Sequence, residues 1–333
     1  MGTLFMIGNG FDLNCGMRTS YKDAYREYVQ TDSDTKVIKA FKEAISSEIG
    51  NWGDFEIAMS KYAESLGSEK EFVECVSDFQ FFLRGFLSRQ EKLFFMSMGQ
   101  VEIKSAVMKE IHESISSFYN GISNNVNFLM TTRGATSLSQ IQFISFNYTT
   151  VFDKLIKSAY EGYSIHLNSV CHIHGGLEDP ILGVDNETQL NTRYPLTAKG
   201  KRSFIKPFFN KQYDSLRVEN AIEAIEKADT ICVFGMSLGL SDLSWRNKIV
   251  SWLVESKTKN LILYDYENAN KKFKTVSDRM NFEEDRKKQK LGEWEVEDVD
   301  KIFEQFHIVC GRNLFNVSDA IRTKHDELQK KGK

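Results

Sequence analysis

The feature that most constrains the fold is a short apolar segment, residues 3–7, that stops at Gly8-Asn9-Gly10. Uninterrupted apolar character is typical of a strand buried on both faces, and such strands occur in parallel sheets covered by helices. The same succession of apolar run and small-residue turn returns at residues 230–234, which precede Gly235. The chain is therefore predicted to form a parallel sheet whose strands end in sharp turns.

Strand-like and helix-like segments alternate through the rest of the sheet-forming sequence. Strands are predicted at residues 141–146, 169–173, 230–234, 260–264 and 306–310, and helices at residues 150–160, 215–227 and 243–255. Such alternation requires crossover helices, which bring the strands into one parallel sheet. We therefore expect an α/β fold, with a Rossmann-like parallel sheet flanked by helices.

The segment between the first two strands has a different character. From residue 20 to about residue 130, apolar side chains recur at helical spacing and proline is absent. We expect a large all-helical insertion at residues 20–135, a core formed by residues 1–19 and 136–315, and a C-terminal helix or tail at residues 316–333. All three prolines lie between residues 179 and 208, an interval predicted to be loop.

Composition excludes several classes of protein. Hydrophobic residues make up 41%, charged residues 27%, and the formal net charge is −3, without the basic excess of nonspecific nucleic-acid binders. The five cysteines are widely spaced and form no Cys-x-x-Cys pair, which favours a reducing compartment. No segment approaches the roughly 20 apolar residues of a membrane span. We expect a cytoplasmic protein with no direct nucleic-acid binding and no membrane segment.

The first turn, Gly8-Asn9-Gly10, is a candidate phosphate-binding loop. Glycines let backbone N–H groups approach a phosphate, and the helix that follows favours negative charge. The third glycine of the usual dinucleotide fingerprint is missing. The alternative is a purely structural turn, in which Asn9 adopts a left-handed conformation and Asp12 caps a helix.

Two polar side chains directly follow other predicted strands. Asn147 comes just after residues 141–146, and His174 precedes the glycine turn at residues 175–176. Ligands bind at the carboxyl edge of open parallel sheets, where an amide can orient water and an imidazole can accept a proton. The alternatives are an Asn147 that caps the next helix and a His174 that serves only the structure.

Two further segments are candidates for the site. The turn from Gly235 to Asp242 opens after an apolar strand and could seat a ribose or a phosphate, while capping by Ser241 or Asp242 is the alternative. Residues 52–56 combine an aromatic ring with two acids that could line a pocket. A helix start capped by Asp54 is the favoured interpretation of that segment.

An ordered set of these segments carries a resemblance to a known family. The set comprises Ile7 to Asp12, Ser20-Tyr21, Trp52 to Glu56, Phe146-Asn147-Tyr148, His172 to Gly175, and Phe234 to Asp242. From residue 4 to about residue 265 the chain resembles the AbiH family of phage abortive-infection proteins. That family in turn resembles the sirtuin-like (SIR2-like) NAD-binding superfamily, so a sirtuin-like core is implied.

The resemblance also implies roles for individual residues. Asn147 and His174 would be catalytic. The residues that would bind NAD are Gly8, Asn9, Gly10, Phe11, Asp12, Gly235, Ser237 and Asp242. The zinc-binding cysteine pairs of sirtuins are absent and Asn9 replaces a small residue, so NAD cleavage is favoured over protein deacetylation. The resemblance thus implies an NAD glycohydrolase that needs no metal and arrests growth during infection.

Two other functions remain open at this point. One is a non-catalytic module that senses a nucleotide and acts through oligomerisation or a partner. The other is a metal-dependent nuclease that uses His172 and His174 together with Asp179 or Asp185. The expected partners are a small-molecule nucleotide, a phage-derived trigger and further copies of the chain, with the helical insertion as a candidate sensor or oligomerisation surface.

Overall fold

The computed structural model describes residues 2–33, 35–47, 50, 54–120, 122, 141–161 and 170–331. Its centre is a sheet of six parallel strands in the order β3-β2-β1-β4-β5-β6. The strands are β1 Thr3–Ile7, β2 Ile141–Ser145, β3 Cys171–His172, β4 Thr230–Phe234, β5 Asn260–Tyr264 and β6 Phe306–Val309. The prediction of a Rossmann-like α/β fold is confirmed.

The first strand, β1, lies in the middle of the sheet. It pairs with β2 on one side and β4 on the other, so that Ile7 lies level with Ser145 and Phe234. The strand order reverses between β1 and β4, and this switch point is where Rossmann sheets bind nucleotides. All five residues of β1 are buried, as expected for a strand covered on both faces.

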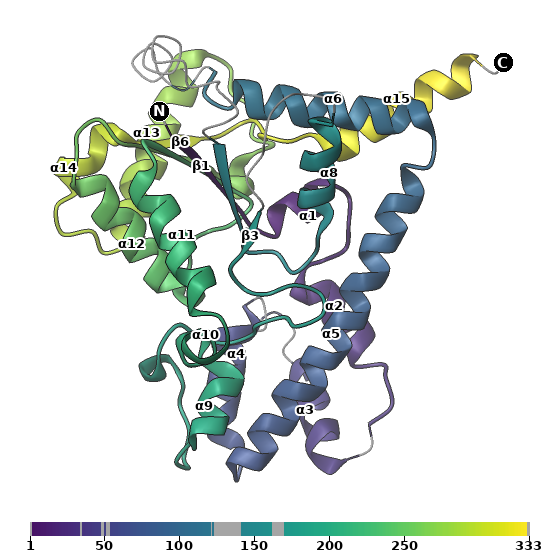
Figure 1. Ribbon diagram of the computed structural model, residues 1–333, viewed down its shortest axis with the longest axis vertical. Helices are drawn as coiled ribbons and strands as arrows, with labels where there is room; N and C mark the ends of the chain where they lie inside the picture. The colour runs from purple at the N-terminus through teal and green to yellow at the C-terminus, as the bar shows by residue number, and fades with distance from the viewer. Residues whose placement is uncertain are drawn as a thin grey trace.

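Helices cover both faces of the sheet (Figure 1). One face holds α1 Gly10–Asn14, α6 Val101–Ser117, α8 Val151–Ala159 and α15 Val317–Lys331. The other holds α11 Ser215–Lys227, α12 Leu243–Val254, α13 Val276–Glu293 and α14 Val299–Ile302. Successive side chains of a strand point to opposite faces of the sheet. Phe5 accordingly packs in the first layer and Leu4 in the second.

A second group of helices, here called the helical lobe, lies below the sheet in Figure 1. It consists of α2 Tyr21–Tyr28, α3 Lys36–Ser47, α4 Phe55–Tyr62, most of α5 Glu69–Ser97, α9 Ala198–Phe204 and α10 Lys206–Tyr213. Its hydrophobic core is rich in aromatic rings. The rings of Phe55 and Phe79 stack with centroids 4.3 Å apart, and Phe72 meets Phe204 edge-on at 5.4 Å.

Helix α5 connects the lobe to the sheet. Its 29 residues span about 43 Å at 1.5 Å per residue. Phe72 near its start is buried in the lobe, whereas Phe94 near its end is buried with the sheet. Helix α6 follows and packs on α8 and α15. The helical segment between β1 and β2 therefore contributes to both parts of the molecule.

The interval predicted to be loop, residues 179–208, contains α9 and the beginning of α10, so this prediction was wrong. Pro207 stands in the first turn of α10, where a missing N–H group costs no hydrogen bond. Thr197 caps α9 by accepting hydrogen bonds from the N–H groups of Lys199 and Gly200. Among the described residues, no helix is both long and apolar enough to span a lipid bilayer.

Candidate functional site

A cavity of about 340 Å³ opens where the carboxyl ends of β1, β2 and β4 face the helical lobe. The predicted catalytic and NAD-binding residues that line it are Gly8, Asn9, Asp12, Asn147, His174, Gly235, Ser237 and Asp242. Further polar lining comes from Thr19, Tyr21, Asp54, Glu56, Tyr148, Thr149, Lys206 and Ser241. The structure therefore brings together segments that are more than two hundred residues apart in the chain.

Two predicted residues of the first turn lie behind this cavity. The side chain of Phe11 is fully buried in the sheet core, where its ring packs edge-on against Phe152 and Phe315. Gly10 packs against Gly235, and a Cβ atom on Gly10 would stand 2.4 Å from the Cα of Gly235. Neither Phe11 nor Gly10 lines the cavity wall.

The glycines are required by the contact between the β1 and β4 turns. A Cβ atom on Gly8 would stand 2.6 Å from the carbonyl oxygen of Gly235, and Gly235 itself has a φ of +75°. The amides of Gly8, Gly10 and Phe11 already donate to carbonyl oxygens of Phe234, Gly235 and Gly8. The N–H groups of Gly8 and Gly10 are thus engaged in the fold, contrary to the expectation that they cradle a phosphate.

Asn9 fastens the first turn to the segment before the helical lobe. Its side-chain nitrogen donates to the carbonyl oxygen of Thr19 at 3.0 Å, and its side-chain oxygen accepts from the Thr19 hydroxyl at 2.7 Å. The backbone of Asn9 is right-handed, with φ −57° and ψ −21°, so the alternative of a left-handed Asn9 was wrong. In the turn after β4, Gly235 has the positive φ of a left-handed backbone.

Asn147 reaches the cavity from the end of β2 and is only 3% exposed. Its Nδ2 atom donates to Asp12 Oδ1 at 3.2 Å, while the other carboxylate oxygen accepts from the Thr149 hydroxyl at 2.7 Å. Within the described residues its Oδ1 atom has no hydrogen-bond partner. Asp12 thus fixes the amide orientation and leaves the amide oxygen for a ligand.

Burial dominates the electrostatics of Asp12. It raises the pKa of this carboxyl group to about 7, although the hydrogen bonds from Thr149 and Asn147 act in the opposite direction. Asp12 belongs to the first turn of α1, yet its side chain faces the β2 end and does not cap that helix.

His174 lies on the same wall and is 7% exposed. Its ring packs edge-on against Phe146, and its Nε2 atom is 3.3 Å from Asp242 Oδ1 without the orientation of a hydrogen bond. Burial lowers the pKa of His174 well below its ordinary value, and the positive charge of Lys206 lowers it further. The imidazole is therefore neutral at pH 7, and one of its ring nitrogens carries no proton.

His172 has a different environment, because β3 ends there and the chain turns before His174. Its Nδ1 atom lies 2.9 Å from the carbonyl oxygen of Asn147, and its Nε2 atom lies 2.9 Å from Asp153 Oδ2. Burial lowers the pKa of His172, but the Asp153 carboxylate more than offsets this and raises it above the ordinary value. His172 and His174 therefore have different surroundings, although only one residue separates them.

The residues of the nuclease alternative do not form one ligand set. The Asp185 carboxylate accepts a hydrogen bond from the Ser244 amide, and His172 is occupied by Asp153. In the part of the chain that the structure describes, no three histidine, cysteine, aspartate or glutamate side chains converge as ligands of a metal ion.

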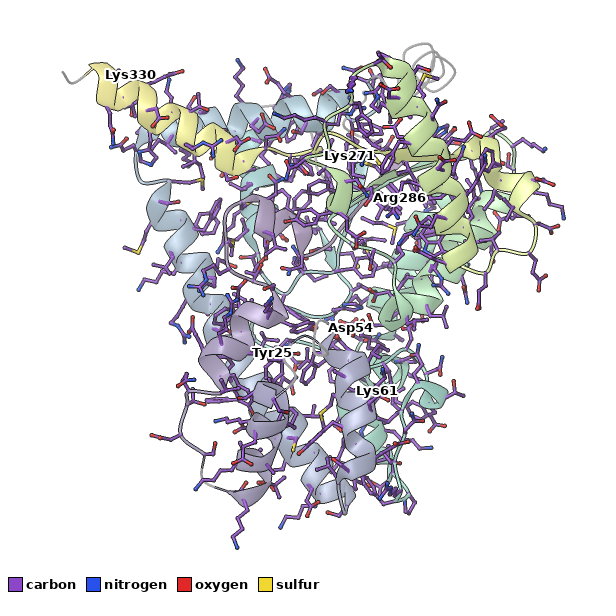
Figure 2. The ribbon with its side chains drawn as sticks, turned by 180° about the vertical axis from the view of Figure 1, so that it is seen from behind. Tyr25, Asp54, Lys61, Lys271, Arg286 and Lys330 are labelled. Atoms are coloured by element: carbon purple, nitrogen blue, oxygen red, sulfur yellow. The ribbon has the colours of Figure 1, made fainter. Side chains whose placement is uncertain are left out.

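The helical lobe supplies the opposite wall of the cavity. Asp54 caps α4 through the amide of Ile57, as predicted, and also accepts from the Ser241 hydroxyl at 3.1 Å. It lies at the level where the lobe meets the sheet (Figure 2). Glu56, in the first turn of α4, accepts a hydrogen bond from the Tyr21 hydroxyl at 2.9 Å. Trp52 lies outside the described residues.

One buried cation joins the two walls. Lys206, at the start of α10, donates to the Ser241 carbonyl oxygen at 2.9 Å and lies 3.4 Å from Asp242 Oδ1. Burial lowers the pKa of its ammonium group, but Asp242 and Glu56 more than offset this and raise it. Lysine is seldom buried, and no local pattern around residue 206 marked it as a site residue.

Comparison with known proteins gives one match. The family model described as bacteriophage abortive infection AbiH matches residues 4–264. No curated protein and no solved structure gives a significant match. The matched range runs from β1 to the end of β5 and contains every residue that lines the cavity.

Proposed function

The chain belongs to the AbiH family of bacteriophage abortive infection proteins, and from this premise we propose that its cavity binds NAD and cleaves the bond between nicotinamide and ribose. Loss of NAD would arrest the growth of an infected cell and limit the spread of phage. A phage-derived signal would control when the protein cleaves NAD.

The observation that carries the proposal is a pair of unpartnered polar atoms in one cavity at the switch point of the sheet. Asn147 Oδ1 and His174 Nε2 are both buried, and neither has a hydrogen-bond partner among the described residues. Leaving a buried polar atom unpaired costs about 1–3 kcal/mol, so such atoms point to a ligand with complementary groups. Water and the hydroxyls of a ribose supply the required donors.

The proposed reaction needs one nucleophile and one base. The C1′–N bond of NAD breaks and its electron pair goes to the nicotinamide ring, which leaves as a neutral molecule. A water molecule held by Asn147 bonds to C1′, and the neutral His174 takes its proton, which yields ADP-ribose. General base catalysis of this kind is typically worth roughly 10²- to 10⁴-fold in rate.

The charges around the base suit the transition state. Cleavage of a glycosidic bond passes through a species with positive charge on the sugar ring. The carboxylate of Asp242 lies beside His174 and would stabilise that charge, while Lys206 holds Asp242 in place. Because the amides of Gly8 and Gly10 are engaged, the diphosphate would be bound by other groups.

The test follows free nicotinamide after NAD is added to the purified protein and to extracts of phage-infected cells that contain it. The infected extract supplies the trigger, because constitutive NAD loss would kill the host. Asn147→Ala and His174→Ala are expected to reduce release at least about 100-fold, as loss of a positioning group or a base does. His325→Ala, on the remote helix α15, is the matched control.

Three outcomes separate the competing functions. Release that depends on Asn147 and His174 supports the glycohydrolase. Release that is equal in the two variants and in the control refutes this site. NAD binding measured by calorimetry, without nicotinamide release in the infected extract, would replace the enzyme with a nucleotide-sensing module.

A further inference from the structure

His172 holds the backbone of Asn147 from outside the cavity in which the proposed reaction occurs. Its ring lines a separate cavity of about 460 Å³ at the edge strand β3 and is not part of the wall formed by Asn147 and His174. Its Nδ1 atom lies 2.9 Å from the carbonyl oxygen of Asn147. Its Nε2 atom lies 3.0 Å and 2.9 Å from the two carboxylate oxygens of Asp153. His172 can therefore affect the reaction only through the groups that it holds.

These two contacts determine the charge of the His172 ring. A carbonyl oxygen and a carboxylate oxygen accept hydrogen bonds and do not donate them, so each ring nitrogen must carry a hydrogen. The ring that satisfies both partners is the positively charged imidazolium. A neutral ring has only one N–H group and must release either the Asn147 carbonyl or the Asp153 carboxylate.

The charged groups that face His172 come from three helices. Asp153 on α8 and Asp12 on α1 attract its positive charge. Arg217 on α11 repels it and is itself paired with Asp214 at 2.6 Å. Burial and Arg217 lower the pKa of His172, but Asp153 more than offsets them and raises it above the ordinary value. The charge that the geometry requires is thus kept to a higher pH than in a free histidine.

The segment that His172 fastens carries the site. Asn147 follows β2 and Asp153 lies in the first turn of α8, so the His172 ring ties together the two ends of the connection between them. The N–H group of Asn147 donates to Ser145 Oγ at 3.2 Å, and its Nδ2 atom donates to Asp12. Among the described residues, the polar atom of Asn147 that has no partner is Oδ1. Loss of the His172 contact would free the backbone from which that oxygen is presented.

We infer that His172 is a positioning residue for the proposed reaction: its doubly protonated ring, held by Asp153, binds the carbonyl oxygen of Asn147 and keeps that residue in place. This inference rests on the proposed function, because Asn147 must hold the attacking water. It predicts that NAD cleavage slows as pH rises and His172 loses its second proton. Asp12 ionises as pH rises through about 7, which strengthens its hold on Asn147 and acts in the opposite direction. His174 is already neutral in this range.

Asp153→Asn separates the charge of the pair from its shape. An asparagine can still accept from Nε2 but does not stabilise the imidazolium, so His172 should lose its second proton at lower pH. Nicotinamide release is followed in buffered extracts of phage-infected cells between pH 6 and pH 9. The pH at which release falls to half should move down by about one unit or more, the effect of removing an opposite charge at this distance. Glu161→Gln, on an exposed residue just after α8, is the matched control.

His172→Gln tests the ring itself. A glutamine is neutral and cannot bind both partners, so kcat should fall at least about tenfold, as misplacement of a reacting group does, whereas KM should change less than about threefold. In the His172→Gln background, Asp153→Asn should no longer move the pH dependence. A shift that comes from another group, such as Glu56, whose pKa burial raises to about 8, would persist in that background.

The protonation of His172 is measured directly by NMR on the full chain with isotope-labelled histidine. The chain has six histidines, and the signal that disappears in His172→Gln identifies residue 172. We expect the pKa of His172 to exceed its ordinary value in the unsubstituted chain and in Glu161→Gln, and to fall in Asp153→Asn. This measurement needs neither NAD nor the phage-derived signal.

The outcomes distinguish this inference from the function on which it rests. If nicotinamide is released with the same pH dependence in Asp153→Asn as in Glu161→Gln, the inference is wrong and the proposed function stands. A pKa of His172 below its ordinary value in the unsubstituted chain also overturns the inference, whatever the protein does to NAD. If the unsubstituted chain releases no nicotinamide, the proposed function fails and the inference fails with it. Thermal unfolding of each variant shows whether lower release reflects loss of the fold, in which case the NMR measurement decides.

Discussion

At the scale of single residues, the orientation of Asn147 depends on a carboxylate that is itself unfavourably placed. Asp12 accepts from both Asn147 and Thr149 while it is almost completely buried. A carboxylate in such a place stabilises the orientation of its partners but lowers the stability of the folded protein above its own pKa. Function and stability are therefore opposed at this residue.

Asp12→Asn is expected to stabilise the protein at pH 8 and to impair the site. The folded-state pKa of about 7 exceeds the ordinary 3.8, so the folded protein binds more protons and stability falls as pH rises between these values. Removing the charge would raise the free energy of unfolding at pH 8 by up to about 4 kcal/mol. An asparagine there has one acceptor oxygen instead of two, so it cannot accept from both Asn147 and Thr149, and the orientation of the Asn147 amide is no longer fixed.

Thermal denaturation at pH 5 and pH 8, with nicotinamide release as the second measurement, checks this prediction. Asp12→Asn should gain stability relative to the unsubstituted chain mainly at pH 8, and its activity should fall at least about tenfold because the Asn147 amide is no longer held in one orientation. A variant with the same pH dependence of stability as the unsubstituted chain would contradict the buried, proton-binding Asp12.

At the scale of structural elements, the turns after β1 and β4 behave as one packed unit. Gly10 contacts Gly235 backbone to backbone, and Gly235 needs a positive φ. Leu238, later in the β4 turn, also has a positive φ of 52°, which is strained for a residue with a side chain. The cavity wall thus depends on a turn whose geometry tolerates little change.

Gly10→Ala is expected to destabilise the fold by about 1–3 kcal/mol, the typical range for overpacking and backbone displacement in a buried site. The added Cβ atom would stand 2.4 Å from the Cα of Gly235, which must move. Gly85→Ala, inside α5, is the matched control, since its Cβ atom meets only a side-chain nitrogen of Arg89 at 3.8 Å. Urea denaturation should show a lower stability for Gly10→Ala and an equal or higher one for the control.

The strands and helices also show how much of the fold the sequence alone predicts. The strand ends before Asn147 and Asp242 were predictable, because uninterrupted apolar runs and the turns that follow them are local features of the chain. The helices α9 and α10 were not, since α9 packs on α5, whose residues lie more than a hundred positions away, and α10 packs on α9 and α11. The position at which β3 ends, between His172 and His174, is likewise set by tertiary structure.

The site residues likewise fall into two groups, those that local sequence features predict and those that depend on tertiary structure. Asn147 and His174 were identified because each directly follows a strand at the ligand-binding edge. Glu56 was predicted only as one of two acids that could line a pocket, and Lys206 was not predicted, because helical positions ordinarily carry charged side chains that face water. Only the docking of the lobe onto the sheet buries these two residues, and periodicity carries no information on that docking.

At the scale of the whole molecule, the cavity walls belong to two different hydrophobic cores. Asn147 and His174 lie at the end of the sheet, whereas Tyr21 and Glu56 belong to the helical lobe. A ligand that contacts both walls stabilises both parts, by about 2.7 kcal/mol when its concentration is 100 times the dissociation constant.

Hydrogen exchange with NAD bound to the His174→Ala protein is expected to slow at two places at once. The first is the turn after β4 on the sheet side, and the second is the start of α4 in the helical lobe. Helix α13 lies on the far part of the sheet and should be unchanged. Slowing confined to the sheet side would show that the lobe does not contact the ligand.

The central position of β1 has a consequence for the synthesis of the protein. The strands that pair with it are made much later, at residues 141–145 and 230–234. During translation, β1 therefore leaves the ribosome well before the strands with which it pairs. Such non-local pairing favours slow folding and leaves apolar surface exposed. Since Asp242 follows the last of these partners, a nascent chain that ends before Asp242 has no complete cavity.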